Sequence, residues 1–212
     1  MGDHLESEFK LRASAPIEVG AVDAALRAVG PPCRAAESRA QVDTYLDDAA
    51  ASLARAGVAL RVREGQGRRV LTCKAQGEVR GGLHVRREVE APWQGAAPPL
   101  RAAELPASLR PLIEPETGER PLAPIVTLHV HREVRVLTEA GHDVCELAVD
   151  SVRATAEGRE ATFQEVELEV LASPEISARL ADELRARLPL AFATEDKPTH
   201  AAALLAIPRP RG

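Results

Sequence analysis

Hydrophobic and charged residues alternate along most of this chain with a period of two, the pattern of β-strands that have one apolar face. The clearest case is residues 162–171, where three glutamates alternate with three aliphatic side chains. Glycines follow several of these segments and predict tight turns between them. Eight segments are predicted to be strands: residues 6–10, 41–47, 58–63, 69–76, 83–91, 125–137, 144–152 and 162–171.

Three or four helices are predicted. Apolar residues at helical spacing place one after Pro16 and one beginning at Ser173–Pro174, and a short helical turn of small residues is predicted to end at Gly57. The Pro-rich segment 92–124, with a short helical stretch near residues 102–110, separates two groups of strands. The strands on both sides show the same alternation of charged and apolar residues. We therefore interpret this segment as an insertion, either a lid or a connector, within a single domain of residues 1–212. The Pro/Arg-rich tail Ile207–Gly212 is predicted to be flexible.

The charged strand faces admit two architectures. An open antiparallel sheet with one face in water gives this alternation, and so does a closed barrel whose charged faces point inward. The charges are sorted by strand, because Arg61 and Arg63 share one face whereas residues 165, 167 and 169 place three carboxylates on another. Like charges on one strand face repel, and a bound cation would relieve that repulsion. We therefore predict an α+β, mainly β fold: an eight-stranded antiparallel closed barrel with helices packed outside.

Composition narrows the range of partners. The chain carries 27 basic and 32 acidic residues, for a net charge of -5, and only 2% aromatic residues. Both values argue against a nucleic-acid partner, which would favour basic patches and aromatic platforms. The three cysteines are widely spaced and form no CxxC pair, so the sequence suggests neither a zinc site nor a disulfide framework. The chain shows no signal peptide or long apolar run, so we expect a cytoplasmic protein with no membrane partner.

Glu6-Ser7-Glu8-Phe9-Lys10 resembles the ExExK signature of the CYTH superfamily, the triphosphate tunnel metalloenzymes. The resemblance covers about residues 4–205 in the family's order. It continues through Tyr45-Leu46-Asp47, Ala59-Leu60-Arg61-Val62-Arg63, Leu71-Thr72-Cys73-Lys74, Arg86-Arg87-Glu88-Val89-Glu90, Glu146 with Asp150, Glu165-Val166-Glu167-Leu168-Glu169 and Thr194-Glu195-Asp196-Lys197. It implies an eight-stranded antiparallel tunnel and a phosphohydrolase that uses Mg²⁺ or Mn²⁺.

The resemblance also implies roles for side chains, in three groups. Hard oxygen ligands for the metal would come from Glu6, Glu8, Glu146, Asp150, Glu165 and Glu167. Phosphate oxygens would be bound by Lys10, Arg61, Arg63, Lys74, Arg86, His129, His131 and Lys197. Catalytic roles are predicted for Lys10, Glu88, Glu90 and Lys197, with Glu88 or Glu90 accepting a proton from the attacking water.

Some positions depart from the family pattern or from the expected face. His129 and His131 stand where the family usually has arginines, and we expect them to face the lumen and make phosphate binding depend on pH. Arg87 and Arg132 have the apolar parity of their strands and are predicted to lie outside the barrel. Glu169, at a strand end, is predicted to be solvated.

Inorganic triphosphate is the substrate that the composition favours, because so few aromatic residues leave no evident slot for an adenine. A thiamine triphosphatase, a nucleoside triphosphatase and an adenylate cyclase remain alternatives within the family. A catalytically weak module that binds polyphosphate or a phosphorylated ligand is the alternative from another class. The sequence also leaves a homodimer open.

Overall fold

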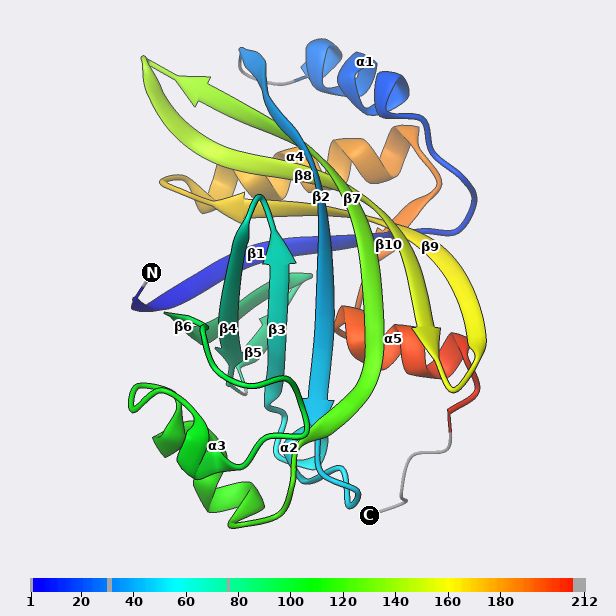
Figure 1. Ribbon diagram of the computed structural model, residues 1–212. Helices are drawn as coiled ribbons and strands as arrows, with labels where there is room; N and C mark the ends of the chain where they lie inside the picture. The colour runs from blue at the N-terminus through cyan, green and yellow to red at the C-terminus, as the bar shows by residue number, and fades with distance from the viewer. Residues whose placement is uncertain (1, 30–31, 76, 208–212) are drawn as a thin grey trace.

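The computed structural model describes residues 2–29, 32–75 and 77–207, and its strands form a closed antiparallel barrel (Figure 1). Around the barrel the neighbours run β1–β9–β8–β7–β2–β3–β4–β6, and β6 pairs back onto β1. The barrel strands are β1 (Asp3–Ala13), β2 (Cys33–Asp47), β3 (Ala59–Gly65), β4 (Arg68–Lys74), β6 (Leu83–Pro92), β7 (Ala123–Glu139), β8 (His142–Ala156) and β9 (Arg159–Val170). The predicted eight-stranded barrel is therefore confirmed.

Strand β1 closes the barrel because it pairs on both sides. Its first half runs beside β6, with Glu6 opposite Arg86, and its second half runs beside β9, with Lys10 opposite Glu167. Closure leaves no unpaired edge in the barrel wall that these described strands form. Two short strands, β5 (Glu78–Arg80) and β10 (Leu190–Phe192), add to β6 and β1.

Helices α1 (Val19–Val29) and α4 (Pro174–Arg187) cover the outer face of β1, β8 and β9. Leu26 of α1 and Leu180 and Leu184 of α4 are buried against the aliphatic side chains that alternate with the charges of these strands. Ser173 caps α4, because its Oγ accepts a hydrogen bond from the Ile176 amide at 3.4 Å. The apolar parity of β1, β8 and β9 is thus outward, as predicted.

The insertion forms an outer layer over β3, β4 and β6, together with α2 (Ser52–Arg55). Trp93, Leu105 and Ile113 are buried there against the outward side chains of the three strands. The helix predicted near residues 102–110 is instead a 3₁₀ turn, η1 (Ala102–Glu104), followed by α3 (Arg110–Thr117). Leu105 precedes a proline and takes extended angles, which separates the two.

Helix α5 (Lys197–Leu204) packs against the inner face of the barrel. Ala201 of α5 and Leu205, the residue that follows the helix, belong to one apolar cluster. The cluster also contains Val126, Leu128 and Val130, which face inward on β7. An apolar helix inside the barrel reverses the usual parity, so the apolar side of β7 points inward here.

None of the described helices is long and apolar enough to span a membrane. The tail predicted to be flexible, apart from Ile207, lies outside the described residues.

Candidate functional site

A cavity of about 260 Å³ lies inside the barrel, and most of the charged residues that are predicted from the sequence to form the site line it. Its described wall is balanced in charge, with eight cationic and eight carboxylate side chains. The cations are Lys10, Arg39, Arg61, Arg63, Lys74, Arg86, Arg132 and Lys197. The carboxylates are Glu6, Glu8, Glu88, Glu90, Glu146, Glu167, Glu169 and Asp196.

Asp43 of β2 orients the two arginines of β3. Both carboxylate oxygens of Asp43 accept from Arg63, from Nε at 2.7 Å and from Nη2 at 2.7 Å, and Arg61 Nη1 donates to Oδ2 at 3.3 Å. Burial alone would raise the pKa of Asp43, but Arg61 and Arg63 outweigh it and hold the pKa well below its ordinary value. A buried aspartate thus fixes two guanidinium groups at the cavity wall. No role is predicted for Asp43 from the sequence.

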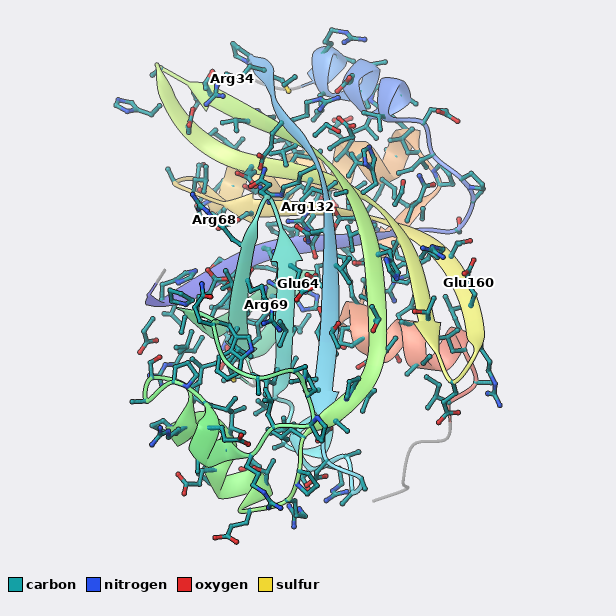
Figure 2. The ribbon with its side chains drawn as sticks, in the orientation of Figure 1. Arg34, Glu64, Arg68, Arg69, Arg132 and Glu160 are labelled. Atoms are coloured by element: carbon teal, nitrogen blue, oxygen red, sulfur yellow. The ribbon has the colours of Figure 1, made fainter. Side chains whose placement is uncertain are left out.

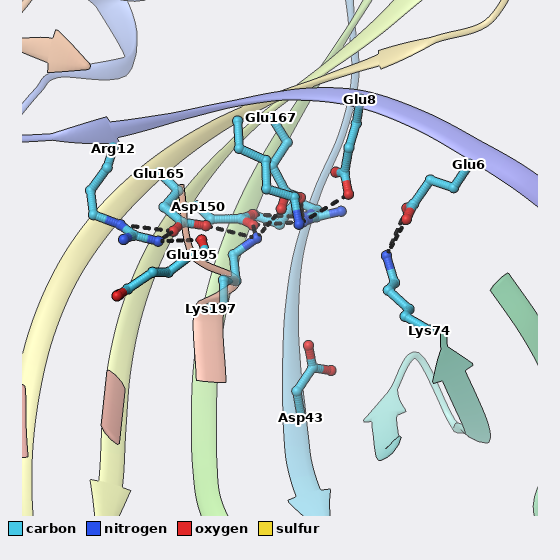
Figure 3. Close-up of polar contacts among 12 residues, drawn as sticks. Glu6, Glu8, Arg12, Asp43, Lys74, Asp150, Glu165, Glu167, Glu195 and Lys197 are labelled. Atoms are coloured by element: carbon cyan, nitrogen blue, oxygen red, sulfur yellow. Dashed lines mark hydrogen bonds and ion pairs between the residues drawn. The ribbon is translucent and has the colours of Figure 1, made fainter. Parts of the chain in front are cut away.

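Glu6 of β1 pairs with Lys74 of β4, as Figure 3 shows, and with Arg86 of β6. Lys74 Nζ lies 2.7 Å from Glu6 Oε1 and 2.7 Å from Glu88 Oε2, while Arg86 reaches Glu6 Oε2 at 3.1 Å and Glu8 Oε1 at 2.8 Å. Burial acts to raise the pKa of Glu6, yet the charges of Lys74 and Arg86 lower it to about 2. Glu6 is therefore ionised at neutral pH and held between two cations.

Lys197, the first residue of α5, is the centre of a second network (Figure 3). Its Nζ lies 2.5 Å from Glu167 Oε1, 2.8 Å from Asp150 Oδ2 and 3.3 Å from Glu165 Oε2. Burial would lower the pKa of Lys197, but Asp150 and Glu167 raise it above its ordinary value. The ammonium therefore stays charged and anchors the beginning of α5 to β8 and β9.

Arg132 belongs to the same network, which corrects its predicted place outside the barrel. Its guanidinium donates to both oxygens of Asp150, at 2.7 and 2.6 Å, and to Glu167 Oε2 at 2.6 Å. Figure 2 shows Arg132 among the strands, whereas Arg34 and Glu160 lie at the periphery. Strand parity misplaces Arg132 because the inward face of β7 is apolar beside α5 and becomes charged only at Arg132.

Arg87, by contrast, lies outside the barrel as predicted. Its guanidinium donates to both carboxylate oxygens of Asp3, at 2.8 and 2.6 Å, and both side chains are about half exposed. An ion pair in this position is screened by water and contributes little to stability.

Two of the predicted metal ligands, Asp150 and Glu165, are fully buried and do not line the cavity. Arg132 and Lys197 occupy the oxygens of Asp150, and Arg12 binds Glu165. Carboxylates committed in this way hold the cationic side chains in place. Because neither residue lines the cavity, we do not include these two among the proposed metal ligands.

The better oxygen donors for a metal are the glutamates that reach the cavity from β1, β8 and β9. Glu8 lies opposite Glu169, and Glu169 lies opposite Glu146. Burial and the charges of Glu6, Glu146 and Glu8 raise the pKa of Glu169 to about 7, so Glu169 is not simply solvated as predicted. This crowding of hard oxygen atoms suits a divalent cation. Among the described residues no three such groups are preassembled as a metal site, since Glu6 and Glu8 are turned to cationic side chains.

The raised pKa of Glu169 predicts a pH-dependent stability of the metal-free protein. The folded pKa lies above the ordinary 4.5, so between about pH 4.5 and 7 the folded state binds more protons than the unfolded state. The free energy of unfolding therefore falls as the pH rises through this window. At pH 8 the neutral glutamine removes the repulsion between Glu169 and the neighbouring carboxylates, so we expect Glu169→Gln to be more stable than the wild type. The gain should be only about 1 kcal/mol, because solvent screens the charge of this partly exposed group.

Urea unfolding in the presence of a chelator, at pH 4.5 and at pH 8, measures this difference. The two proteins should converge at the lower pH. A Glu169→Gln variant that is less stable than the wild type at pH 8 would contradict the crowding of carboxylates.

His129 and His131 lie on the outer face of β7, so the prediction that they face the lumen is wrong. Both line a separate external groove, and His131 Nε2 lies 3.1 Å from Glu133 Oε1 on the same face. The physical reason is again α5, which packs inside the barrel against the aliphatic residues of β7. The histidines alternate with those aliphatic residues along the strand, and side chains at alternating positions point to opposite faces.

The external position of the two histidines predicts that they do not control phosphate binding. The double variant His129→Gln/His131→Gln should keep the wild-type Kd for tripolyphosphate within about twofold between pH 6 and 8, since neither imidazole reaches the cavity. Calorimetric titration at three pH values measures it. A loss of affinity confined to pH 6 would contradict their external position.

The remaining predicted residues are brought together in the cavity. Lys10 is buried and lies 3.1 Å from Glu8, and Glu90 accepts a hydrogen bond from Thr72 Oγ1 at 3.0 Å. Asp43 and Tyr45 share one parity on β2, and that alternation was the signal that could have identified them. The cavity and its supports also include residues for which no role is predicted from the sequence: Arg39, Asp43, Tyr45 and Thr72.

Solved structures of other proteins share this barrel fold. A candidate adenylyl cyclase from Hippeastrum, described as having a dominant triphosphatase activity, has a similar structure, with a TM-score of 0.66, 20% identity, and coverage of 98% of this chain and 100% of that chain. A candidate adenylate cyclase from Bacillus halodurans has a TM-score of 0.59 and 20% identity, with coverage of 94% of this chain and 98% of that chain. A search of curated protein sequences found no match.

The family comparison is more specific than these structural similarities. The family model of the CYTH domain matches residues 4–201, nearly the whole of the chain. The match spans the eight barrel strands, apart from Asp3, and most of α5. The chain therefore belongs to the CYTH domain family.

Proposed function

We propose that this protein is a metal-dependent hydrolase of triphosphates and that inorganic triphosphate is its preferred substrate. The observation that carries the proposal is the cavity inside the barrel, in which eight cationic side chains are held among carboxylates. Phosphoryl transfer depends mainly on positioning and on stabilisation of charge, so a rigid array of cations is suited to it. The dominant triphosphatase activity described for the Hippeastrum protein is compatible with this proposal.

The size and lining of the cavity favour a small inorganic substrate. Its volume of about 260 Å³ suits a short phosphate chain better than a whole nucleotide. Tyr45 is the one aromatic residue other than histidine among the described lining residues, and it is packed in the apolar cluster beside α5. The described cavity wall therefore offers no pair of large rings between which an adenine could stack.

The proposed phosphate ligands come from several barrel strands and from α5. Arg61 and Arg63 present guanidinium groups that can bind two oxygens of one phosphate. Lys10, Lys74 and Lys197 act as point charges on other walls. The complete proposed set is Lys10, Arg39, Arg61, Arg63, Lys74, Arg86, Arg132 and Lys197.

The charge balance of the cavity supports a role for Mg²⁺ or Mn²⁺. A triphosphate brings several negative charges to a wall whose cations are already balanced by an equal number of described carboxylates. When bound, a divalent cation would supply positive charge next to the phosphate oxygens. The proposed ligands all reach the cavity: Glu6, Glu8, Glu146, Glu167 and Glu169.

For the proton of the attacking water we propose Glu90 rather than Glu88. Burial acts to raise the pKa of Glu88, but Lys74 and Arg61 outweigh it, and the lowered pKa makes Glu88 a weaker base. Glu90 has no cation within ion-pairing distance among the described residues and is oriented by Thr72. It therefore keeps an oxygen available to accept a proton.

A phosphate-release assay tests the proposal on tripolyphosphate, ATP and thiamine triphosphate, each with Mg²⁺, with Mn²⁺ and with a chelator. We expect release that requires a metal and is fastest with tripolyphosphate. Faster release from an organic triphosphate would change the substrate, and formation of a cyclic nucleotide from ATP would change the reaction. Tight binding without turnover of any compound would identify a binding module and overturn the proposal.

A further inference from the structure

Residues 193–196 connect β10 to α5 and bring the first residue of that helix to the cavity wall. Asp196 and Lys197 both line the cavity. The Asp196 carboxylate caps the helix, because its Oδ1 accepts a hydrogen bond from the Thr199 amide at 3.0 Å. The position of this connection therefore decides where the Lys197 ammonium lies.

The connection is fastened to β1 and to β6. The amide of Ala193 donates to the carbonyl oxygen of Lys10 at 2.9 Å, and Arg12 donates to the carbonyl oxygen of Glu195 at 3.2 Å (Figure 3). The contact with β6 is made by His84, whose Nε2 lies 2.9 Å from the carbonyl oxygen of Ala193. Ala193 is only 3% exposed, so this oxygen would be buried without a donor if the imidazole were removed.

The residue before Ala193 also contacts the beginning of β6. The ring of Phe192 packs over Gly82, where the Cβ of any other residue would collide with it. The guanidinium group of Arg185 on α4 lies over the same ring, 4.1 Å from its centroid. Two successive residues are thus seated against Gly82 and His84, and the hydrogen bond to His84 fixes the second of them.

The chemistry of His84 suits a neutral hydrogen-bond donor. The residue is 7% exposed and does not line the cavity. Burial and the charge of Lys10 lower the pKa of His84, so its imidazole is neutral at neutral pH. A neutral imidazole carries one N–H, and a carbonyl oxygen can only accept, so the contact with Ala193 places the proton on Nε2.

We propose that His84 is a positioning residue whose imidazole holds the connection 193–196 against β6 and thereby keeps Lys197 in place to bind the phosphate chain. This inference rests on the proposed triphosphate substrate. A phosphate contact that is equally strong in the ground state and in the transition state affects KM rather than kcat. We therefore expect His84→Asn to raise the KM for tripolyphosphate with Mg²⁺ about tenfold and to lower kcat by less than about threefold.

His84→Gln is the matched variant, because it carries the same amide group on a longer side chain. The glutamine amide nitrogen can take the place of Nε2, whereas the asparagine amide nitrogen takes the place of Nδ1 and falls short of Ala193. His84→Gln should therefore keep KM within about threefold of the wild type. His142→Asn, at the exposed turn between β7 and β8, controls for the loss of a histidine and should leave KM unchanged.

Hydrogen exchange followed by mass spectrometry reports whether the connection still holds α5. In His84→Asn the amides of α5 should exchange faster than in the wild type, while those of α4 should not change. In His84→Gln both helices should match the wild type. Equally faster exchange of α4 and α5 in both variants would show that His84 has a general packing role, and would overturn the inference.

The kinetic results separate failure of this inference from failure of the proposed function. An unchanged KM in His84→Asn, or a KM raised equally in His84→Asn and His84→Gln, would show that the hydrogen bond does not position Lys197. The proposed function would then stand. No turnover of tripolyphosphate by the wild type with either metal would overturn the proposed function and this inference with it.

Discussion

Replacing Lys197 with methionine is expected to lower the free energy of unfolding by about 3–5 kcal/mol, because it leaves buried carboxylates without their shared cation. The Lys197 ammonium lies within 3.3 Å of oxygens of Asp150, Glu165 and Glu167, and the residue is only 7% exposed. Methionine keeps roughly the length of the side chain but not its charge. The loss should also loosen α5, whose first residue is Lys197.

Urea unfolding measures this change, and Arg153→Gln is its matched control. Arg153 pairs with Glu160 at 3.2 Å, but both side chains are about half exposed, so its removal should cost less than about 0.5 kcal/mol. A Lys197→Met variant within about 1 kcal/mol of the wild type would show that the buried network does not hold α5 in the barrel.

Replacing Glu8 with glutamine is expected to lower metal-dependent turnover roughly 100-fold while the protein stays folded. Glu8 is 3% exposed and lies between Arg86, at 2.8 Å, and Lys10, at 3.1 Å. The neutral amide removes one proposed metal ligand and releases two cations. We therefore expect the affinity for tripolyphosphate without metal to rise even as turnover falls.

Steady-state phosphate release and calorimetry with a chelator measure the two opposite effects. Glu160→Gln is the control, since Glu160 is exposed on the outside of the barrel and should leave both values within about twofold of the wild type. Full metal-dependent turnover in Glu8→Gln would remove Glu8 from the metal site.

The barrel could be predicted because most of its strands obey one simple rule, with charge inside and apolar side chains under external helices. Residues 165–169 of β9 follow this rule, and their aliphatic partners pack under α1 and α4 as expected. The rule fails on β7, where α5 fills the interior and Val126, Leu128 and Val130 face inward. Strand parity alone does not show which side of a strand a distant helix will cover.

Other features depend on tertiary contacts that leave little local signal. The first part of β2, residues 33–40, lacks an alternating pattern and becomes a strand by pairing with β7. Helix α5 is rich in alanine and has no marked apolar stripe, so it was not predicted. The burial of Asp150 and Glu165 behind the cavity wall follows from their contacts with Arg132, Lys197 and Arg12, which lie on other elements.

The most direct test of the central proposal is ³¹P NMR of tripolyphosphate incubated with the protein. With Mg²⁺ or Mn²⁺ present, we predict that the signal of the central phosphorus disappears while pyrophosphate and phosphate appear in equal amounts. With a chelator the tripolyphosphate signals should persist. Tripolyphosphate that remains intact with both metals, in the presence of folded protein, would contradict the account.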